Sequence, residues 1–547
     1  MKIERQWGIS LLAILAVGPG LMLNSALTPL QGLLQKTLDS SSYPSIIPIL
    51  TGTIAFALFV PLGPFLRHKW GDKTTYITSA CISLLGVLLS LISTKFIVFE
   101  AGRVLQGMGA GMALMMMLPM LVLAFPISRR NLALLILIGG FYGSSMIGVC
   151  FGTLVSHTGH WKEIFYVAVV CSILAILLGY TLLSNEGTRH AKEKAHFDWM
   201  GFVWAGIFAL LTAFTVLSLQ KWGGSSLYVW IGLGGSVLSF LFLFITEYST
   251  TKPLLSFKLI LHKKPLLAIL VVITGYIAMT LSLASLQGIL KTVNTLPNKE
   301  MVIVYLCLLV GVAVAAILSC LLYDKLGPGI LGMLGALLII GVNLTWMYAG
   351  DHKPYTFFAI SFFVLILGVG FTIASGLMGA ALGGPLPDLV PRMATVQFLR
   401  MIAYAAIPVI SSYLLNRFSE HHLTNGSSEG VSEQSVEKSQ LLASHDLFFS
   451  SFSASLVLLC FSFLMALTGK GHKLAHKPHH GRNEEGKENS LSNEEVVQSP
   501  QPPPLYTKDA VIPDHDYRKA LQKFKQLKQT QTNDDVFREA LKKFREK

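Results

Sequence analysis

The residues of this sequence best suited to chemistry are Glu100, Arg103 and Gln106, which lie within the apolar segment of residues 96–123. A positive charge at membrane depth is costly and persists where it faces a protein interior or water. Helical spacing places the three side chains on roughly one face, because residues three and four positions apart stack along a helix. We therefore expect a polar cavity in which Arg103 senses a substrate or coupling ion, with Glu100 or Asn24 as its partner. The alternative is that Arg103 only pairs with a polar neighbour.

The other polar residues inside apolar segments are amides and a second arginine rather than acids. Every Asp and Glu can be placed at a segment end, in a connection or in the C-terminal tail. A carboxylate in a carrier cavity can bind and release a proton, so its absence weakens a simple proton-antiport mechanism. Hydrogen bonding between helices is the alternative role for each amide. The candidate cavity residues are Asn24, Gln31, Gln106, Gln287, Asn343, Gln397 and Arg400.

Apolar blocks of membrane-spanning length must position these side chains. Of the 547 residues, 52% are hydrophobic and 13% are charged. A soluble domain has about 25% charged residues, so the composition indicates a membrane protein. The predicted fold class is an all-α polytopic membrane protein with fourteen transmembrane helices, each able to cross an apolar core of about 30 Å. The expected spans are residues 8–34, 44–66, 75–94, 96–124, 132–155, 164–184, 200–219, 226–246, 265–289, 300–322, 328–349, 355–383, 395–416 and 447–468.

The charge distribution predicts how these spans are oriented in the bilayer. The net charge of +13 is divided among short connections and a tail, which argues against a nucleic-acid partner. If the N-terminus is cytoplasmic, the inward connections carry more Lys and Arg than the outward ones. The positive-inside rule then places both termini in the cytoplasm of a multi-pass protein of the cell inner membrane.

The sequence lacks the patterns of an enzyme or an ATP-driven pump. All six cysteines fall within apolar runs, so we expect neither disulfides nor a metal site. We find no nucleotide-binding loop, no nucleophile constellation and no metal-ligand spacing. The sequence therefore predicts no cofactor and no enzymatic activity.

The segment Arg103-Val-Leu-Gln106-Gly107-Met-Gly109-Ala-Gly111 carries a resemblance to a known family. It resembles the fourth-span pattern R-x-x-x-G-x-G-x-G of the fourteen-span drug:proton antiporter branch of the major facilitator superfamily. The similarity extends over residues 8–468 and implies that superfamily's fold, with Arg103 taking part in proton coupling. Gly107 and Gly111 also form a GxxxG pair, which lets another helix approach closely.

Two connections resemble the cytoplasmic signature loops of the superfamily. Residues 67–73 place a glycine and a basic residue as the signature G-x-L-x-D-R-x-G-R does, with His68 where an acid is common, and residues 322–327 repeat the pattern with both acid and base. Such loops bias the inward-closed or inward-open state through charge pairs and helix ends. A generic basic loop is the alternative. The residues expected to control conformation are Lys69, Gly71, Asp72, Asp324, Lys325 and Gly327.

Other segments support the fourteen-span branch or depart from it. Residues 197–201 and 247–259 resemble the two flanks of the additional pair of central spans. In span five the antiporter pattern G-P-x-x-G-G is degraded, although Gly148 and Gly152 remain as helix-packing residues. In span one Asn24 stands where many relatives carry an acid, and an amide cannot carry a proton in the usual way.

We expect four parts in the chain: a six-helix bundle at 1–184, two additional spans with flanking loops at 185–264, a second six-helix bundle at 265–468, and a basic tail at 469–547. The polar segment 420–445 predicts an extracytoplasmic flexible loop. Two similar units at 517–524 and 537–544 place apolar residues beneath a basic face, as interfacial amphipathic helices do. The tail then touches the inner leaflet or a cytoplasmic partner, and a solvated extension is the alternative.

The predicted function is secondary active transport by alternating access, exporting amphipathic small molecules or drugs across the lipid bilayer. A proton or a sodium ion is the candidate coupling ion. One alternative is a transporter of a specific anionic metabolite or siderophore-like compound, because the cavity charges are positive. An alternative from another class is a transport-inactive membrane scaffold.

Overall fold

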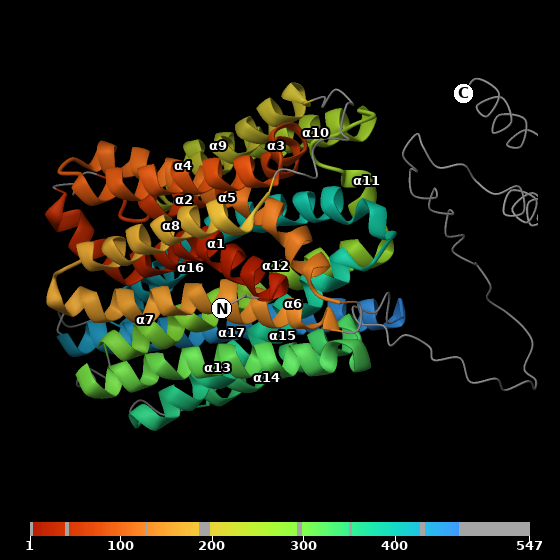
Figure 1. The fold of residues 1–547 in the computed structure, drawn as a ribbon. Helices are drawn as coiled ribbons and strands as arrows, with labels where there is room; N and C mark the ends of the chain where they lie inside the picture. Colours follow the sequence, from red (N-terminus) through yellow and green to blue (C-terminus); the bar gives the residue numbers. More distant parts are fainter. Residues whose placement is uncertain are drawn as a thin grey trace, which may run out of the picture. The chain divides into compact units, whose positions relative to one another are not determined.

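The structure is a computed structural model, and every regular element in its described residues is a helix. The helices lie side by side, with α13, α14 and α17 together on the side away from α2, α4 and α5 (Figure 1). Predictions for the tail fall outside the described residues. The described residues are 4–38, 43–126, 129–184, 197–292, 298–348, 353–426 and 433–469.

The helices of the first part of the chain pack mainly on one another. They are α1 (Arg5–Thr37), α2 (Ile47–Phe59), α3 (Leu62–Trp70), α4 (Asp72–Ile92), α5 (Phe96–Ala124), α6 (Leu132–Leu135), the π-helix η2 (Ile136–Tyr142), α7 (Gly143–Thr158) and α8 (Lys162–Leu182). The central part holds α9 (Trp199–Trp222), α10 (Leu227–Ser249) and α11 (Phe257–Ile260). The last part holds α12 (Lys263–Thr292), α13 (Asn298–Leu326), α14 (Pro328–Met347), α15 (Tyr355–Ala381), η4 (Leu386–Asp388), α16 (Leu389–Gly426) and α17 (Glu433–Leu467).

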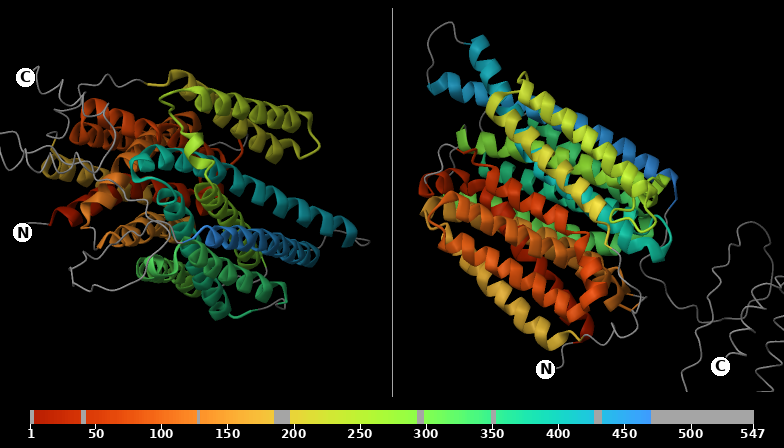
Figure 2. Two further views of the ribbon diagram at one scale, coloured as in Figure 1. Left: turned by 90° about the vertical axis from the view of Figure 1, so that its right-hand side faces the viewer. Right: turned by 90° about the horizontal axis from the view of Figure 1, so that it is seen from above.

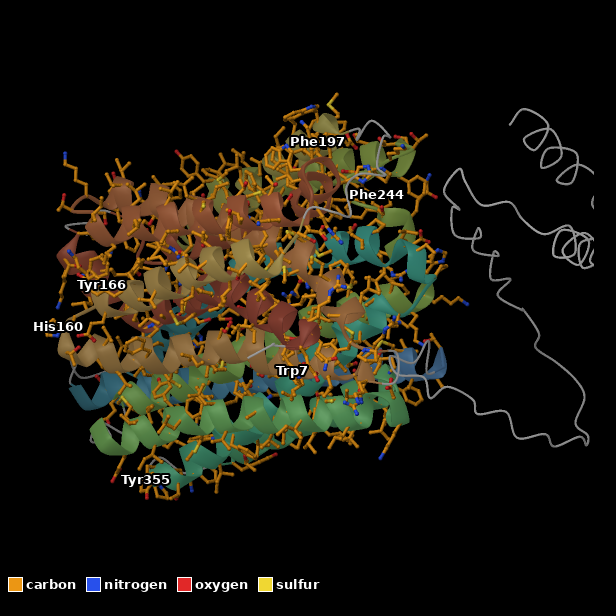
Figure 3. The ribbon with its side chains drawn as sticks, in the orientation of Figure 1. Trp7, His160, Tyr166, Phe197, Phe244 and Tyr355 are labelled. Carbon is orange, nitrogen blue, oxygen red and sulfur yellow. The ribbon has the colours of Figure 1, made fainter. Side chains whose placement is uncertain are left out.

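The count of spans agrees with the fourteen predicted. Among the described residues, 13 helices are long and apolar enough to cross a membrane, and the bent pair α2 and α3 makes the count 14 when taken as one span. Successive spans run in opposite directions. Figure 3 accordingly shows His160 and Tyr355 toward one end of the helices and Phe197 and Phe244 toward the other.

Two glycines with the same backbone conformation set the turns after α3 and α13. Gly71 has φ 87° and ψ 169°, and Gly327 has φ 81° and ψ 168°. A positive φ favours glycine because it has no Cβ. The two signature loops predicted from sequence therefore turn in the same way in both halves of the chain.

Glycines on α5 and α7 bring neighbouring backbones into close contact. A Cβ on Gly107 would overlap the carbonyl oxygen of Gly52, and one on Gly111 would overlap that of Phe56. These positions hold α2 against α5. On α7, Gly148 and Gly152 face the backbone of α1 in the same way. The small residues thus set the spacing of the helices that carry Asn24 and Arg103.

The additional pair α9 and α10 lies along the periphery of the helix bundle (Figure 2). α9 contacts both α2 and α16, so it bridges the two halves of the chain. Asp198 Oδ1 accepts the amide of Gly201 at 2.9 Å and caps the start of α9. Glu247 Oε2 accepts the amide of Leu255 at 3.0 Å and ties the end of α10 to the following segment.

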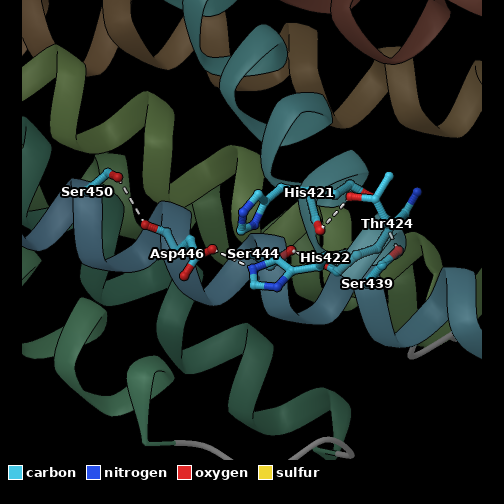
Figure 4. A network of polar contacts seen from close by, with 9 residues as sticks. His421, His422, Thr424, Ser439, Ser444, Asp446 and Ser450 are labelled. Atoms are coloured by element: carbon cyan, nitrogen blue, oxygen red, sulfur yellow. Dashed lines mark hydrogen bonds and ion pairs between the residues drawn. The ribbon is translucent and has the colours of Figure 1, made fainter. Parts of the chain in front are cut away.

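The prediction of a flexible loop at residues 420–445 is wrong for the described part of that segment. α16 continues to Gly426 and α17 begins at Glu433. Ser439 and Ala443 are 3% and 0% exposed, so small residues let the two helices pack closely. His422 Nε2 and Asp446 Oδ2 lie 2.6 Å apart across the pair (Figure 4). The polar composition misled the prediction because polar residues also occupy the exposed faces of helices, while the buried Ser439 and Ala443 form the contact between them.

Candidate functional site

A cavity of about 560 Å³ lies between the first and last parts of the chain. Side chains from α1, α2, α5, η2 and α7 line one side of it, and side chains from α12, α15, α16 and α17 line the other. Most of these lining residues lie in the middle of their spans or toward the end of the helix bundle at which α1 terminates. Its size falls within the range of small-molecule sites, about 300–1,000 Å³.

Arg400 is the one formally charged side chain among the described residues that line the cavity. It is 9% exposed, and its guanidinium carbon lies 4.9 Å from the centroid of the Tyr404 ring. Tyr404 in turn stacks on Tyr276 with a centroid distance of 3.6 Å and an interplanar angle of 15°. These three residues form a cationic and aromatic cluster on α12 and α16, which we call the Arg400 cluster.

Several polar atoms of cavity-lining residues have no hydrogen-bond partner among the described residues. Gln397 Oε1, Gln220 Oε1 and Ser411 Oγ are all buried and unpartnered. Buried polar groups normally have a partner, so these atoms mark places for a ligand or water to bind. Within the described residues, no group of three or more His, Cys, Asp or Glu could hold a metal ion.

Arg103 does not line this cavity. The side chain is 1% exposed, and its Nε donates to the carbonyl oxygen of Pro48 at 3.2 Å. Its Nη1 and Nη2 donate to Gln106 Oε1 and Asn24 Oδ1. The guanidinium is therefore enclosed by α1, α2 and α5 directly behind the cavity wall.

Asn24 connects Arg103 with the cavity. Its Nδ2 donates to Thr53 Oγ1 at 3.2 Å, and both residues line the cavity. Gly52 leaves room for this arrangement, because a Cβ there would lie 2.6 Å from Arg103 Nη2 and 3.1 Å from Asn24 Oδ1. Asn24 is thus the hydrogen-bonded link between Arg103 and the cavity.

Glu100 lies on the same helix as Arg103 but bonds to a different partner. Its Oε2 accepts the hydroxyl of Thr51 at 2.6 Å. Its Oε1 is buried without a hydrogen-bond partner. Glu100 therefore joins α5 to α2 outside the cavity lining, and it is a carboxylate one helical turn from Arg103.

The structure separates the candidate site residues into groups. Asn24, Gln31, Gln287, Gln397 and Arg400 line the cavity, whereas Arg103, Glu100 and Gln106 lie behind it. Asn343 does not line the cavity and takes the alternative role of hydrogen bonding between helices, because it is 0% exposed and bonds within a network of serines. That network comprises Ser282, Ser451 and Ser455.

The sequence did not lead us to predict the aromatic residues of the Arg400 cluster, or the glycine, Gly52, that leaves space for the Arg103 side chain. Tyr404 follows Arg400 by four positions, a helical spacing that was visible in the sequence. Tyr276 lies on another helix, and its stacking on Tyr404 depends on the tertiary fold. The same is true of Gly52, whose role depends on side chains from α1 and α5.

Comparison with known proteins now decides the family. The sequence pattern that defines the Major Facilitator Superfamily matches residues 10–411. This chain belongs to the major facilitator superfamily. It is a membrane transporter by family, and the resemblance inferred from the fourth span is confirmed.

Individual proteins that resemble this chain include other transporters and a resistance protein. The chain is 46% identical over 479 residues to the Bacillus subtilis (strain 168) protein named uncharacterized MFS-type transporter YubD, covering 88% of this chain and 92% of that protein. It is 27% identical over 280 residues to the quinolone resistance protein NorB of Staphylococcus aureus (strain MRSA252), covering 47% of this chain and 57% of NorB. The crystal structure of the human organic anion transporter MFSD10 superposes with a TM-score of 0.52 at 12% identity, covering 82% of this chain and 99% of that chain. At that identity the likeness shows the fold alone.

The signature loop of the superfamily contains an ion pair that the sequence did not single out. Arg67 Nε and Asp72 Oδ1 lie 2.6 Å apart across the turn at Gly71. Lys69, the predicted basic partner, is exposed. In the second half Asp324 and Lys325 occupy the last turn of α13 before Gly327.

One contact closes the two halves of the transporter at the end of the bundle that carries these loops. Asn131 Nδ2 donates to the carbonyl oxygen of Cys320 at 3.0 Å. The short elements α6 and η2 pack on α13 around it. The halves also meet farther along the spans, where Cys150 Sγ donates to the carbonyl oxygen of Tyr305 at 3.0 Å.

Proposed function

We propose that this protein is a secondary active transporter that works by alternating access and exports amphipathic small molecules. The observation that carries the proposal is the cavity between the two halves, whose lining combines apolar side chains with a few polar groups. A substrate site near the middle of the spans and between two bundles is what alternating access requires. The lining supplies Phe141, Met279 and Ile373 as apolar surface for such a substrate.

Export rather than import is supported by the resistance proteins among the relatives. A resistance protein that is a transporter protects a cell by moving a toxic compound out of it. The match to NorB covers 47% of this chain, so it supports the direction of transport but does not identify the compound. The adaptable methionine and aromatic side chains suit substrates of varied shape.

In the proposed cycle, the halves rock about the cavity and open it to each side in turn. The Asn131–Cys320 contact breaks when the opposite end closes, and the turns at Gly71 and Gly327 accommodate the change. We propose that both termini are cytoplasmic, which makes this contact the cytoplasmic seal. Glu100 and Arg103 are the proposed coupling residues, with a proton or sodium ion as the driving ion.

Flux in proteoliposomes tests the proposal. Purified protein is reconstituted, a pH or sodium gradient is imposed, and uptake of a chemically varied panel of amphipathic compounds is compared with empty liposomes. The proposal predicts gradient-driven flux of at least one amphipathic compound. Absence of flux for the entire panel under both gradients contradicts it and favours the scaffold alternative.

A further inference from the structure

The cavity holds an uncompensated positive charge. Among the described residues, no carboxylate forms an ion pair with Arg400, and the cavity lining contains no Asp or Glu. Its Nε is buried without a hydrogen-bond partner. A buried cation without a counter-ion is costly, so an anion that enters the cavity gains charge-assisted hydrogen bonds.

Aromatic rings lie directly beside this charge. The Arg400 guanidinium lies over the Tyr404 ring, and Tyr276 stacks on Tyr404. Tyr142 lies on η2, in the other half of the transporter. Its hydroxyl donates to Sδ of Met279 on α12 at 3.3 Å. A planar aromatic ligand can therefore contact rings from both halves while its anionic group faces Arg400.

Unpartnered amides elsewhere in the cavity lining can hold the polar groups of such a ligand. Gln397 lies three positions before Arg400 on α16, is 1% exposed, and has no partner for Oε1. Gln220 reaches the cavity from α9 and is also unpartnered at Oε1. These atoms accept hydrogen bonds from hydroxyl or amine groups on a ligand.

We propose that the cavity binds an aromatic organic anion, with the anionic group against Arg400 and the ring against Tyr276 and Tyr404. This inference rests on the proposed transport function and specifies its substrate class. A cationic substrate would be repelled by Arg400 and would find no carboxylate in the described lining. A small inorganic anion would leave the apolar surfaces of a 560 Å³ cavity unused.

A matched pair of dyes tests the charge preference. Fluorescein and rhodamine 123 share a xanthene core, but the first is an anion and the second a cation at neutral pH. Binding of each dye to the full-length protein in nanodiscs is measured by fluorescence anisotropy. We expect the Kd of fluorescein to be at least about tenfold lower than that of rhodamine 123, because only fluorescein gains a close charge contact with Arg400.

Variants assign the preference to the Arg400 cluster. Arg400→Gln should raise the Kd of fluorescein by roughly 30-fold or more, because it removes the charge that pairs with the anion. Arg400→Lys should recover part of the affinity. Tyr404→Phe should keep the affinity, and Tyr404→Leu should lower it. The matched control is Arg417→Gln on the same helix, since Arg417 is 68% exposed and lies outside the cavity lining.

The possible outcomes separate this inference from the transport proposal. Equal affinity for both dyes, tighter binding of rhodamine 123, no binding of either dye, or an unchanged Kd in a folded Arg400→Gln variant each overturns the inference. Folding of every variant is checked by size-exclusion chromatography and thermal melting. Binding of fluorescein without flux in proteoliposomes leaves the anion site standing and contradicts transport. Flux of rhodamine 123 without binding of fluorescein supports transport and overturns the anion site.

Discussion

Arg103 on α5 donates a hydrogen bond from Nη2 to Asn24 Oδ1 on α1, and Asn24 rather than Arg103 lines the cavity. The buried charge is therefore positioned to sense the cavity through an amide. A change in the position of Asn24 on ligand binding would alter the hydrogen bonds of Arg103. This link gives the proposed coupling role of Arg103 a definite route.

The first prediction concerns that link. Asn24→Leu leaves Arg103 Nη2 without its acceptor, which costs about 1.5–3 kcal/mol for a bond to a charged group. Where about 1.4 kcal/mol of this cost falls on the rate-limiting step of the cycle, flux falls roughly tenfold. Asn24→Asp keeps an acceptor and should retain most of the flux, whereas Arg103→Ala should abolish it in a protein that still folds. Flux of Arg103→Ala equal to wild type would show that Arg103 only pairs helices.

The second prediction concerns the space that Gly52 leaves for the guanidinium. Gly52→Ala places a Cβ 2.6 Å from Arg103 Nη2, so the guanidinium must shift away from Asn24. We expect a loss of stability of about 1–3 kcal/mol, as for other overpacked cores, together with reduced flux. Thermal melting and flux are compared with Gly32→Ala on α1, where a Cβ meets nothing within 4 Å. Equal behaviour of the two variants contradicts the prediction.

Sequence reasoning was strong where the signal is local. Span positions follow from apolar length, and the turns at Gly71 and Gly327 follow from short patterns within one connection. It failed where contacts join distant segments. The stacking of Tyr276 on Tyr404 and the seat that Gly52 provides for Arg103 depend on helices from different parts of the chain.

The third prediction concerns two carboxylates that meet where α9 begins and α10 ends. A Cβ on Gly201 would lie 2.9 Å from Asp198 Oδ2 and would overlap Glu247 Oε1, so both oxygens flank one glycine. Neither oxygen has a hydrogen-bond partner among the described residues. Glu247→Gln keeps the acceptor for the Leu255 amide and adds a donor for Asp198, so its melting temperature should equal or exceed that of wild type. Glu247→Ala removes the acceptor and should lower stability by about 1–3 kcal/mol. A Gln variant less stable than the Ala variant would contradict this arrangement.

The fourth prediction tests the helical extension of α16 and α17. Ser419 Oγ and Ser439 Oγ lie 3.4 Å apart, close enough for the paired cysteines Ser419→Cys and Ser439→Cys to form a disulfide. In a background without the native cysteines, mild oxidation should cross-link this pair efficiently. The control pair of Ser419→Cys and Ser450→Cys lies three helical turns away along α17 and should stay reduced. Similar cross-linking of both pairs would indicate the flexible loop that the polar composition suggested. The cross-link is measured on a gel. After cleavage at a protease site inserted at 427–432, the two fragments stay together only where the disulfide has formed.

The fifth prediction concerns the seal between the two halves. Because Asn131 Nδ2 lies 3.0 Å from the carbonyl oxygen of Cys320, the two residues are neighbours when this end is closed, and a short bifunctional methanethiosulfonate reagent should cross-link Asn131→Cys to the native Cys320. Alternating access requires the two residues to separate in every cycle. The cross-link should therefore stop flux in a protein whose other cysteines are replaced by serine, and dithiothreitol should restore it. The matched control is the same background with Asn131 intact, in which the reagent should leave flux unchanged. Full flux through a cross-linked protein would mean that this end stays closed during transport, and the proposed rocking of the two halves would then be wrong.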